Sequence, residues 1–130
     1  MSVELKMLLF TIVLGVLQLL MATTASTMRR GLGWNLSARD EKKPDLTGIP
    51  GRMDRSFKNL METFVFFVGA VLALQLSSKN GSISSLGSEI YFGCRLIYVP
   101  IYIFGIPVLR TLVWTASMIG LFMILFQICS

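Results

Sequence analysis

Three polar residues, Arg55, Asn59 and Glu62, stand at a spacing of four and then three where a charged segment meets an apolar one. Because a helix advances about 100° per residue, the three share one helix face. Ionisable groups at membrane depth are costly and usually mark functional sites. The spacing therefore predicts a ligand-binding face. The alternative is a local network at the start of a helix, with Glu62 bonded to Asn59 or Arg55.

A second polar face follows later in the chain. Arg95, Tyr98 and Tyr102 repeat at a spacing of three and then four, which again places them on one side of a helix. A buried ion pair between Arg95 and Glu62, which would lock two helices together, is the structural alternative. Two helices thus present matching polar faces.

Further arginines stand close to the ends of apolar segments. Arg110 follows Gly105 and Pro107 in a short turn, and Arg29 and Arg30 end the first apolar segment. Guanidinium groups gathered on one membrane face can hold the carboxylates of a small anionic ligand by paired hydrogen bonds. Topology signals or interfacial stops would explain the same arginines without a ligand.

Apolar segments that can position these residues make up most of the chain. Of its 130 residues, 54% are hydrophobic and only 15% are charged, which indicates an integral membrane protein. About 20 residues of helix cross the hydrocarbon, so each segment can span once its flanking turns are added. We predict four transmembrane helices in one domain, at about 5–26, 57–77, 89–107 and 109–129.

The distribution of lysine and arginine predicts the orientation. The connection at about 28–55 is rich in both, whereas the connection between the second and third spans offers only Lys79, so the long connection should be cytoplasmic and both termini should face outward. Glycines and prolines in that connection predict an irregular path, and Trp34 fits an interfacial anchor. A cleaved signal peptide is the alternative for the first segment, although Glu4 cancels the charge of Lys6.

Several kinds of chemistry lack the residues that they need. The chain has no histidine, which removes the usual proton shuttle and most transition-metal ligation, and we predict no metal site. Cys94 and Cys129 are isolated in apolar segments, so we expect neither a disulfide nor a reactive thiol. The net charge of +5 lies where membrane topology accounts for it, so no nucleic-acid partner is expected.

With these motifs in order, the chain resembles the MAPEG family, the membrane-associated proteins in eicosanoid and glutathione metabolism. The family hallmark is an R-x-x-x-N-x-x-E element that opens the second of four spans, matched here by Arg55, Asn59 and Glu62. The pattern from Arg95 through Tyr98 to Tyr102 is also similar. The likeness covers essentially the whole chain and is greatest to the bacterial branch, which implies an inner-membrane protein with periplasmic termini.

The resemblance implies a homotrimer of left-handed four-helix bundles that binds glutathione between subunits near the cytoplasmic face. Residue by residue, the ligand contacts would come from Arg55, Asn59 and Glu62, from Tyr98 and Tyr102 of the adjacent subunit, from Arg95, and from Arg30 or Arg29. Arg110 would stabilise the glutathione thiolate as the catalytic residue. The gap from Tyr102 to Arg110 is one residue longer than in the eicosanoid-forming members, with Pro107 inside it.

The implied activity is a glutathione transferase or peroxidase that acts on lipophilic electrophiles entering from the bilayer. Without a histidine base, the protein would contribute binding, orientation and electrostatic stabilisation. A non-catalytic lipid-binding member of the same family is one rival. A small four-span multidrug transporter is another, but its membrane carboxylate lies in the first span, where this chain has only Gln18.

Overall fold

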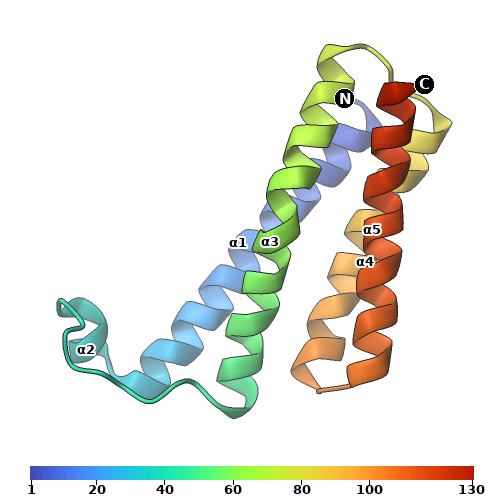
Figure 1. Ribbon diagram of the computed structural model, residues 1–130. Coiled ribbons are helices and arrows are strands. Elements are labelled where there is room, and N and C mark those ends of the chain that lie inside the picture. The colour runs from blue at the N-terminus through green and yellow to red at the C-terminus, as the bar shows by residue number, and fades with distance from the viewer.

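The computed structural model describes residues 1–130 and contains only helices and their connections. The helices are α1 (Val3–Arg30), α2 (Leu32–Leu36), α3 (Gly48–Leu76), α4 (Ser82–Ile103) and α5 (Pro107–Cys129). Four of them are long and pack together, while α2 stands apart in the connection between α1 and α3 (Figure 1). The expectation of an all-helical protein is confirmed, with five helices present where four were expected.

The connections between the helices lie at two opposite ends of the protein, which we call the terminal end and the loop end. The terminal end holds both chain termini and the turn at residues 77–81 (Figure 1). The loop end holds the connection at residues 31–47 and the turn at residues 104–106. Toward the loop end, α1 and α3 diverge, which opens a cleft between them (Figure 1).

Three helices, α1, α3 and α5, are long and apolar enough to cross a membrane. This finding supports an integral membrane protein. The helix α4, expected as the third span at about 89–107, instead runs from Ser82 to Ile103 and is not among the three. Its additional first turns contain Ser82, Ser84, Ser85 and Ser88, and two charged residues, Glu89 and Arg95, follow within the helix.

The connection at about 28–55 is more helical than its glycines and prolines predicted. It contains the end of α1, the whole of α2, and the first two turns of α3. Pro50 lies in the first turn of α3, where a proline costs little because the missing N–H has no helical partner there. A Cβ on Gly51 would lie 2.4 Å from the carbonyl oxygen of Leu46, so this glycine lets the connection pass close to the helix.

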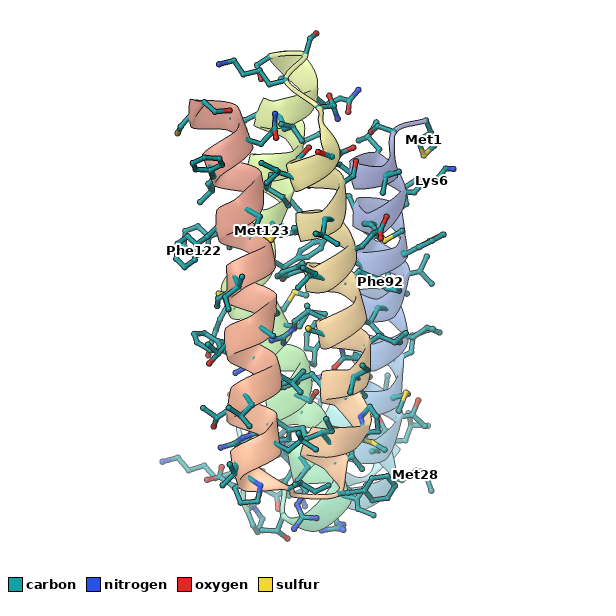
Figure 2. The ribbon with its side chains drawn as sticks, turned by 90° about the vertical axis from the view of Figure 1, so that its right-hand side faces the viewer. Met1, Lys6, Met28, Phe92, Phe122 and Met123 are labelled. Atoms are coloured by element: carbon teal, nitrogen blue, oxygen red, sulfur yellow. The ribbon has the colours of Figure 1, made fainter.

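The contact between α4 and α5 depends on a pair of glycines. A Cβ on Gly87 would lie 2.6 Å from the carbonyl oxygen of Gly120, and a Cβ on Gly120 would lie 2.5 Å from that of Gly87. Small residues of this kind let helix backbones approach closely within a membrane. On α5, Met123 turns toward the other helices, whereas Phe122 projects outward and is 64% exposed (Figure 2).

Apolar side chains form the central core, and most of the polar groups on α4 face it as well. Phe67 of α3 stacks on Tyr91 of α4 with ring centroids 4.0 Å apart, and the Tyr91 hydroxyl is hydrogen-bonded to Thr63 at 2.8 Å. Ser84 and Ser88 are fully buried, while Leu86 and Ile97 of the same helix are about half exposed. The buried face of α4 thus carries Ser84 and Ser88, whereas its outward face is apolar except for Ser82 and Glu89, which are exposed near its start.

Candidate functional site

Arg95 is a buried guanidinium in the middle of the protein. It is 1% exposed, and its Nη1 donates a hydrogen bond of 3.0 Å to Oδ1 of Asn59. Its Cζ lies 4.4 Å from the ring centroid of Tyr98, while its buried Nε has no hydrogen-bond partner. The polar faces of α3 and α4 thus meet, and the buried Nε of Arg95 is left without a hydrogen-bond partner.

The structural alternatives that involved Glu62 are wrong for this chain. Glu62 is exposed on α3 and forms no hydrogen bond or ion pair with Asn59, Arg55 or Arg95. The only two ion pairs in the protein are Lys43 with Glu41, and Lys58 with Asp54. Arg95 is therefore buried without a carboxylate, which costs free energy unless another group compensates its charge.

A row of two aromatic rings between two cations continues from Arg95 toward the loop end. The rings of Tyr98 and Tyr102 have centroids 5.5 Å apart, and Cζ of Arg110 lies 4.9 Å from the ring centroid of Tyr102. Cation–π contacts of this geometry hold a guanidinium in place without using its hydrogen-bond donors. The donors of Arg110 therefore stay available to a ligand.

A cavity of about 220 Å³ lies beside this row. Its lining residues are Asn59, Tyr98, Tyr102, Arg110, Thr111 and Trp114. Sequence reasoning placed the two tyrosines on a different subunit from Asn59, yet here one chain brings all of them together. It also missed Thr111 and Trp114, although Trp114 lies one helical turn after Arg110 and so shares its face of α5.

A second cavity, of about 140 Å³, lies under the turn between α4 and α5. Three arginines line it, Arg52, Arg55 and Arg110, together with Tyr102, Gly105, Ile106 and Pro107. No acidic residue lines this cavity, and Arg55 is exposed without an ion-pair partner. Three guanidinium groups with no carboxylate among them favour an anionic ligand.

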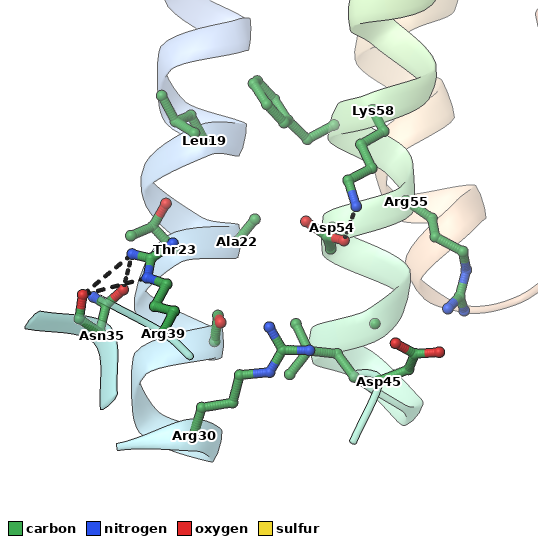
Figure 3. Close-up of a pocket in the computed structure, with 14 residues that line it drawn as sticks. Leu19, Ala22, Thr23, Arg30, Asn35, Arg39, Asp45, Asp54, Arg55 and Lys58 are labelled. Carbon is green, nitrogen blue, oxygen red and sulfur yellow. Dashed lines mark hydrogen bonds and ion pairs between the residues drawn. The ribbon is translucent and has the colours of Figure 1, made fainter. Parts of the chain in front are cut away.

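Arg30 lies on another side of α3, in the cleft between α1 and α3. This cleft has a volume of about 560 Å³, and Arg30 and Arg55 both line it (Figure 3). Nη2 of Arg30 donates a hydrogen bond of 3.1 Å to the carbonyl oxygen of Pro44, and its Cζ lies 5.1 Å from the Trp34 ring centroid. A single chain does not bring Arg30 to the cavities that Arg110 lines.

The predicted site residues therefore fall into three sets. One cavity is lined by Asn59, Tyr98, Tyr102 and Arg110, and Arg95 donates a hydrogen bond to Asn59. Arg55 links the cleft of Arg30 to the cavity under the turn. Glu62 lines none of these cavities, and Arg29 is exposed beside Arg30. The two cysteines, Cys94 and Cys129, are both free.

One of three comparisons with known proteins gives a match. No curated protein and no solved structure matches the chain significantly. The model of the MAPEG family does match, over residues 7–130. The match includes the four long helices and every candidate site residue. On that evidence, this membrane protein belongs to the MAPEG family.

Proposed function

We propose that the protein is a membrane-bound, glutathione-dependent transferase or peroxidase that acts on lipophilic electrophiles. The observation that supports this most directly is Arg110, which Tyr102 holds at the edge of a cavity shared with Asn59 and Tyr98. The donors and cations around that cavity suit a small peptide that carries carboxylates and a thiol.

Each site residue has a distinct role in this proposal. Arg55 and Asn59 hold the carboxylates and amides of the glutathione peptide, and Glu62 holds its amino group. Arg95 orients Asn59 through their hydrogen bond of 3.0 Å. The Nε of Arg95 has no hydrogen-bond partner, and no carboxylate forms an ion pair with this guanidinium. Both observations support a site in which an anionic ligand balances the charge of Arg95.

Arg110 stabilises the thiolate. A free thiol with a pKa near 8.5 is only a few per cent ionised at neutral pH, and a guanidinium that lowers the pKa by about two units supplies roughly 2.7 kcal/mol. The thiolate sulfur then bonds to an electrophilic carbon, either expelling halide or breaking the π bond of an alkene whose other carbon takes a proton from water. With a hydroperoxide, two glutathione thiols are oxidised to a disulfide while the hydroperoxide is reduced to an alcohol and water. With no histidine in the chain, positioning and charge stabilisation are the means of catalysis.

The electrophile reaches the site from the bilayer. Thr111 and Trp114 of α5 line the cavity next to Arg110, and neighbouring residues of that helix, such as Leu112 at 61% exposed, face outward. In this proposal α4 is the fourth span of a left-handed four-helix bundle, because its outward face beyond Glu89 is apolar and most of its polar groups are buried. The loop end is cytoplasmic and both termini are periplasmic, as in a bacterial inner membrane.

A homotrimer accounts for the residues that one chain leaves apart. Arg30 and Glu62 do not line the cavity of Arg110 within the same chain. A neighbouring copy that packs against α3 can supply the missing residues to a site between subunits. A lipid-binding protein without catalysis is the second candidate, and the exposed hydrogen-bond donors around the cavity argue against it.

Calorimetry on detergent-purified protein tests this proposal. We expect saturable glutathione binding by the wild-type protein and none by Arg55→Ala, with binding retained in Lys79→Ala at the opposite end. A screen of alkenes, halides and lipid hydroperoxides follows if binding is seen. No binding by the wild-type protein would overturn the glutathione proposal and favour the lipid-binding candidate.

A further inference from the structure

The carbonyl group of Ile103 lacks its usual helical partner. In a continuous helix it would accept a hydrogen bond from the N–H group four residues later, but that residue is Pro107, which has none. Helix α4 ends at Ile103 and Pro107 begins α5. A carbonyl left over at a helix end needs a donor from elsewhere.

Arg52 of α3 supplies that donor. Its Nη1 donates a hydrogen bond of 3.1 Å to the carbonyl oxygen of Ile103, across 51 residues of sequence. The guanidinium also places a positive charge at the C-terminus of α4, where the partial charges of the helix favour a cation. Arg52 therefore ends α4 in the way that a C-terminal cap does.

The same guanidinium packs on the glycine in the turn. Gly105 has a φ of +72°, and a Cβ built on it would lie 3.2 Å from Cζ of Arg52 and 3.4 Å from both Nη atoms. A side chain at this position would be strained and would also crowd the guanidinium. The hydrogen bond to Ile103 and the contact with Gly105 hold the turn from two points.

This turn connects the two residues that flank the proposed thiolate site. The N–H of Gly105 donates to the carbonyl of Tyr102 at 3.0 Å, and the N–H of Arg110 donates to that of Ile106 at 3.1 Å. A shift of the turn would therefore change the position of Arg110 relative to Tyr102. A small misplacement of a catalytic group can cost a large part of its effect.

We propose that Arg52 is a positioning residue, which holds the turn between α4 and α5 and thereby places Arg110 over the cavity. Contacts within the chain support the part of this proposal in which Arg52 holds the turn. The expected effect of Arg52 on the bound thiol rests on the proposed function. Arg52 does not touch the reacting sulfur. Its effect passes through the backbone of residues 103–110.

Hydrogen–deuterium exchange in the full-length protein without ligand tests the contact itself. In Arg52→Met we expect the amides of residues 104–110 to exchange about tenfold faster, as for the loss of one hydrogen bond, and Arg52→Lys to restore most of the protection. Lys79→Gln is the matched control, because its Nζ donates to the carbonyl of Ser130 at 3.2 Å at the other end of α5. Unchanged exchange in Arg52→Met would overturn the proposal.

Gly105→Ala gives an independent test if Arg52→Met does not fold. The added methyl group should displace the guanidinium and speed exchange in the same amides, whereas Gly93→Ala, which meets nothing within 4 Å, should not. Faster exchange throughout the protein, with no preference for residues 104–110, would show a general loss of packing and contradict a local role.

A pH titration of bound glutathione, followed by thiolate absorbance, tests the consequence for Arg110. We expect Arg52→Met to raise the apparent pKa of the bound thiol and, because Arg52 also lines the cavity of Arg55 and Arg110, to weaken glutathione binding as well. A change in Kd without a change in the thiol pKa would contradict positioning of Arg110. If the wild-type protein binds no glutathione, the proposed function fails, and the exchange data still decide the role of Arg52 in the turn.

Discussion

The two ends of the protein use their polar residues in opposite ways. At the terminal end, Glu4 is 1% exposed, and its Oε1 accepts hydrogen bonds from Ser84 at 2.5 Å and Ser85 at 3.2 Å. Toward the loop end, Arg95 is equally buried, yet it has one hydrogen bond from Nη1, no carboxylate partner, and an unbonded Nε.

The difference is the one that we expect between a structural contact and a ligand-binding site. Hydroxyl groups at the start of α4 satisfy the Glu4 carboxylate, and the N-terminus of that helix favours its negative charge. Near the loop end, Arg52, Arg55 and Arg110 line one cavity with no acid among them. We therefore expect substitutions at the terminal end to change stability, and substitutions near the loop end to change ligand affinity and activity.

Arg110→Ala should give the largest effect. We expect kcat/KM with glutathione at neutral pH to fall by about a hundredfold, because both the thiolate stabilisation and a charged contact with the ligand are lost. The apparent pKa of the bound thiol should rise toward its free value near 8.5, so the loss should shrink as the pH rises above that value. Full activity in this variant at neutral pH would remove Arg110 from the mechanism.

Gly87→Ala tests the packing of α4 on α5, which both ends share. The added Cβ would lie 2.6 Å from the carbonyl oxygen of Gly120, so the helices must move apart, at a cost of about 2 kcal/mol. Thermal unfolding in detergent measures this loss. Gly93→Ala on the same helix is the matched control, since its Cβ meets nothing within 4 Å; an equal drop in Tm for both variants would contradict the close contact.

Arg95→Met should separate affinity from stability. We expect glutathione affinity to fall about tenfold because Asn59 loses the donor that orients it. The unliganded protein should keep its Tm or gain slightly, since a buried cation without a carboxylate is replaced by an apolar side chain of similar length. Calorimetry and thermal unfolding of the same samples check both parts, and a large fall in Tm would mean that Arg95 acts mainly in folding.

Glu4→Gln should give the smallest effect and the opposite pattern. The amide keeps an acceptor for Ser84 and Ser85 but loses the negative charge, so we expect a loss of about 1 kcal/mol or less in the free energy of unfolding. Glutathione affinity should not change. If Glu4→Gln weakens glutathione binding as much as Arg95→Met does, the contrast between the two ends is wrong.

The sequence by itself was enough for the class of protein and for four of the six residues that line the cavity of Arg110. Long apolar segments require helices in a membrane, because only helices satisfy every backbone group within their own segment. The spacing of Asn59 on one helix and of Arg95, Tyr98 and Tyr102 on the next predicted a polar face on each helix, and the structure shows that the two faces meet. Both inferences depend on periodicity, which is local and can be read along the chain.

Tertiary structure decided which of these residues meet and which stay apart. It left Glu62 exposed, placed Arg30 in a different cleft from Arg110, and added Trp114 to the cavity. It also joined Arg52 to the carbonyl of Ile103, 51 residues away. Spacing cannot reveal such contacts, because they depend on how far α1 and α3 diverge, where α4 ends, and how the turn directs α5.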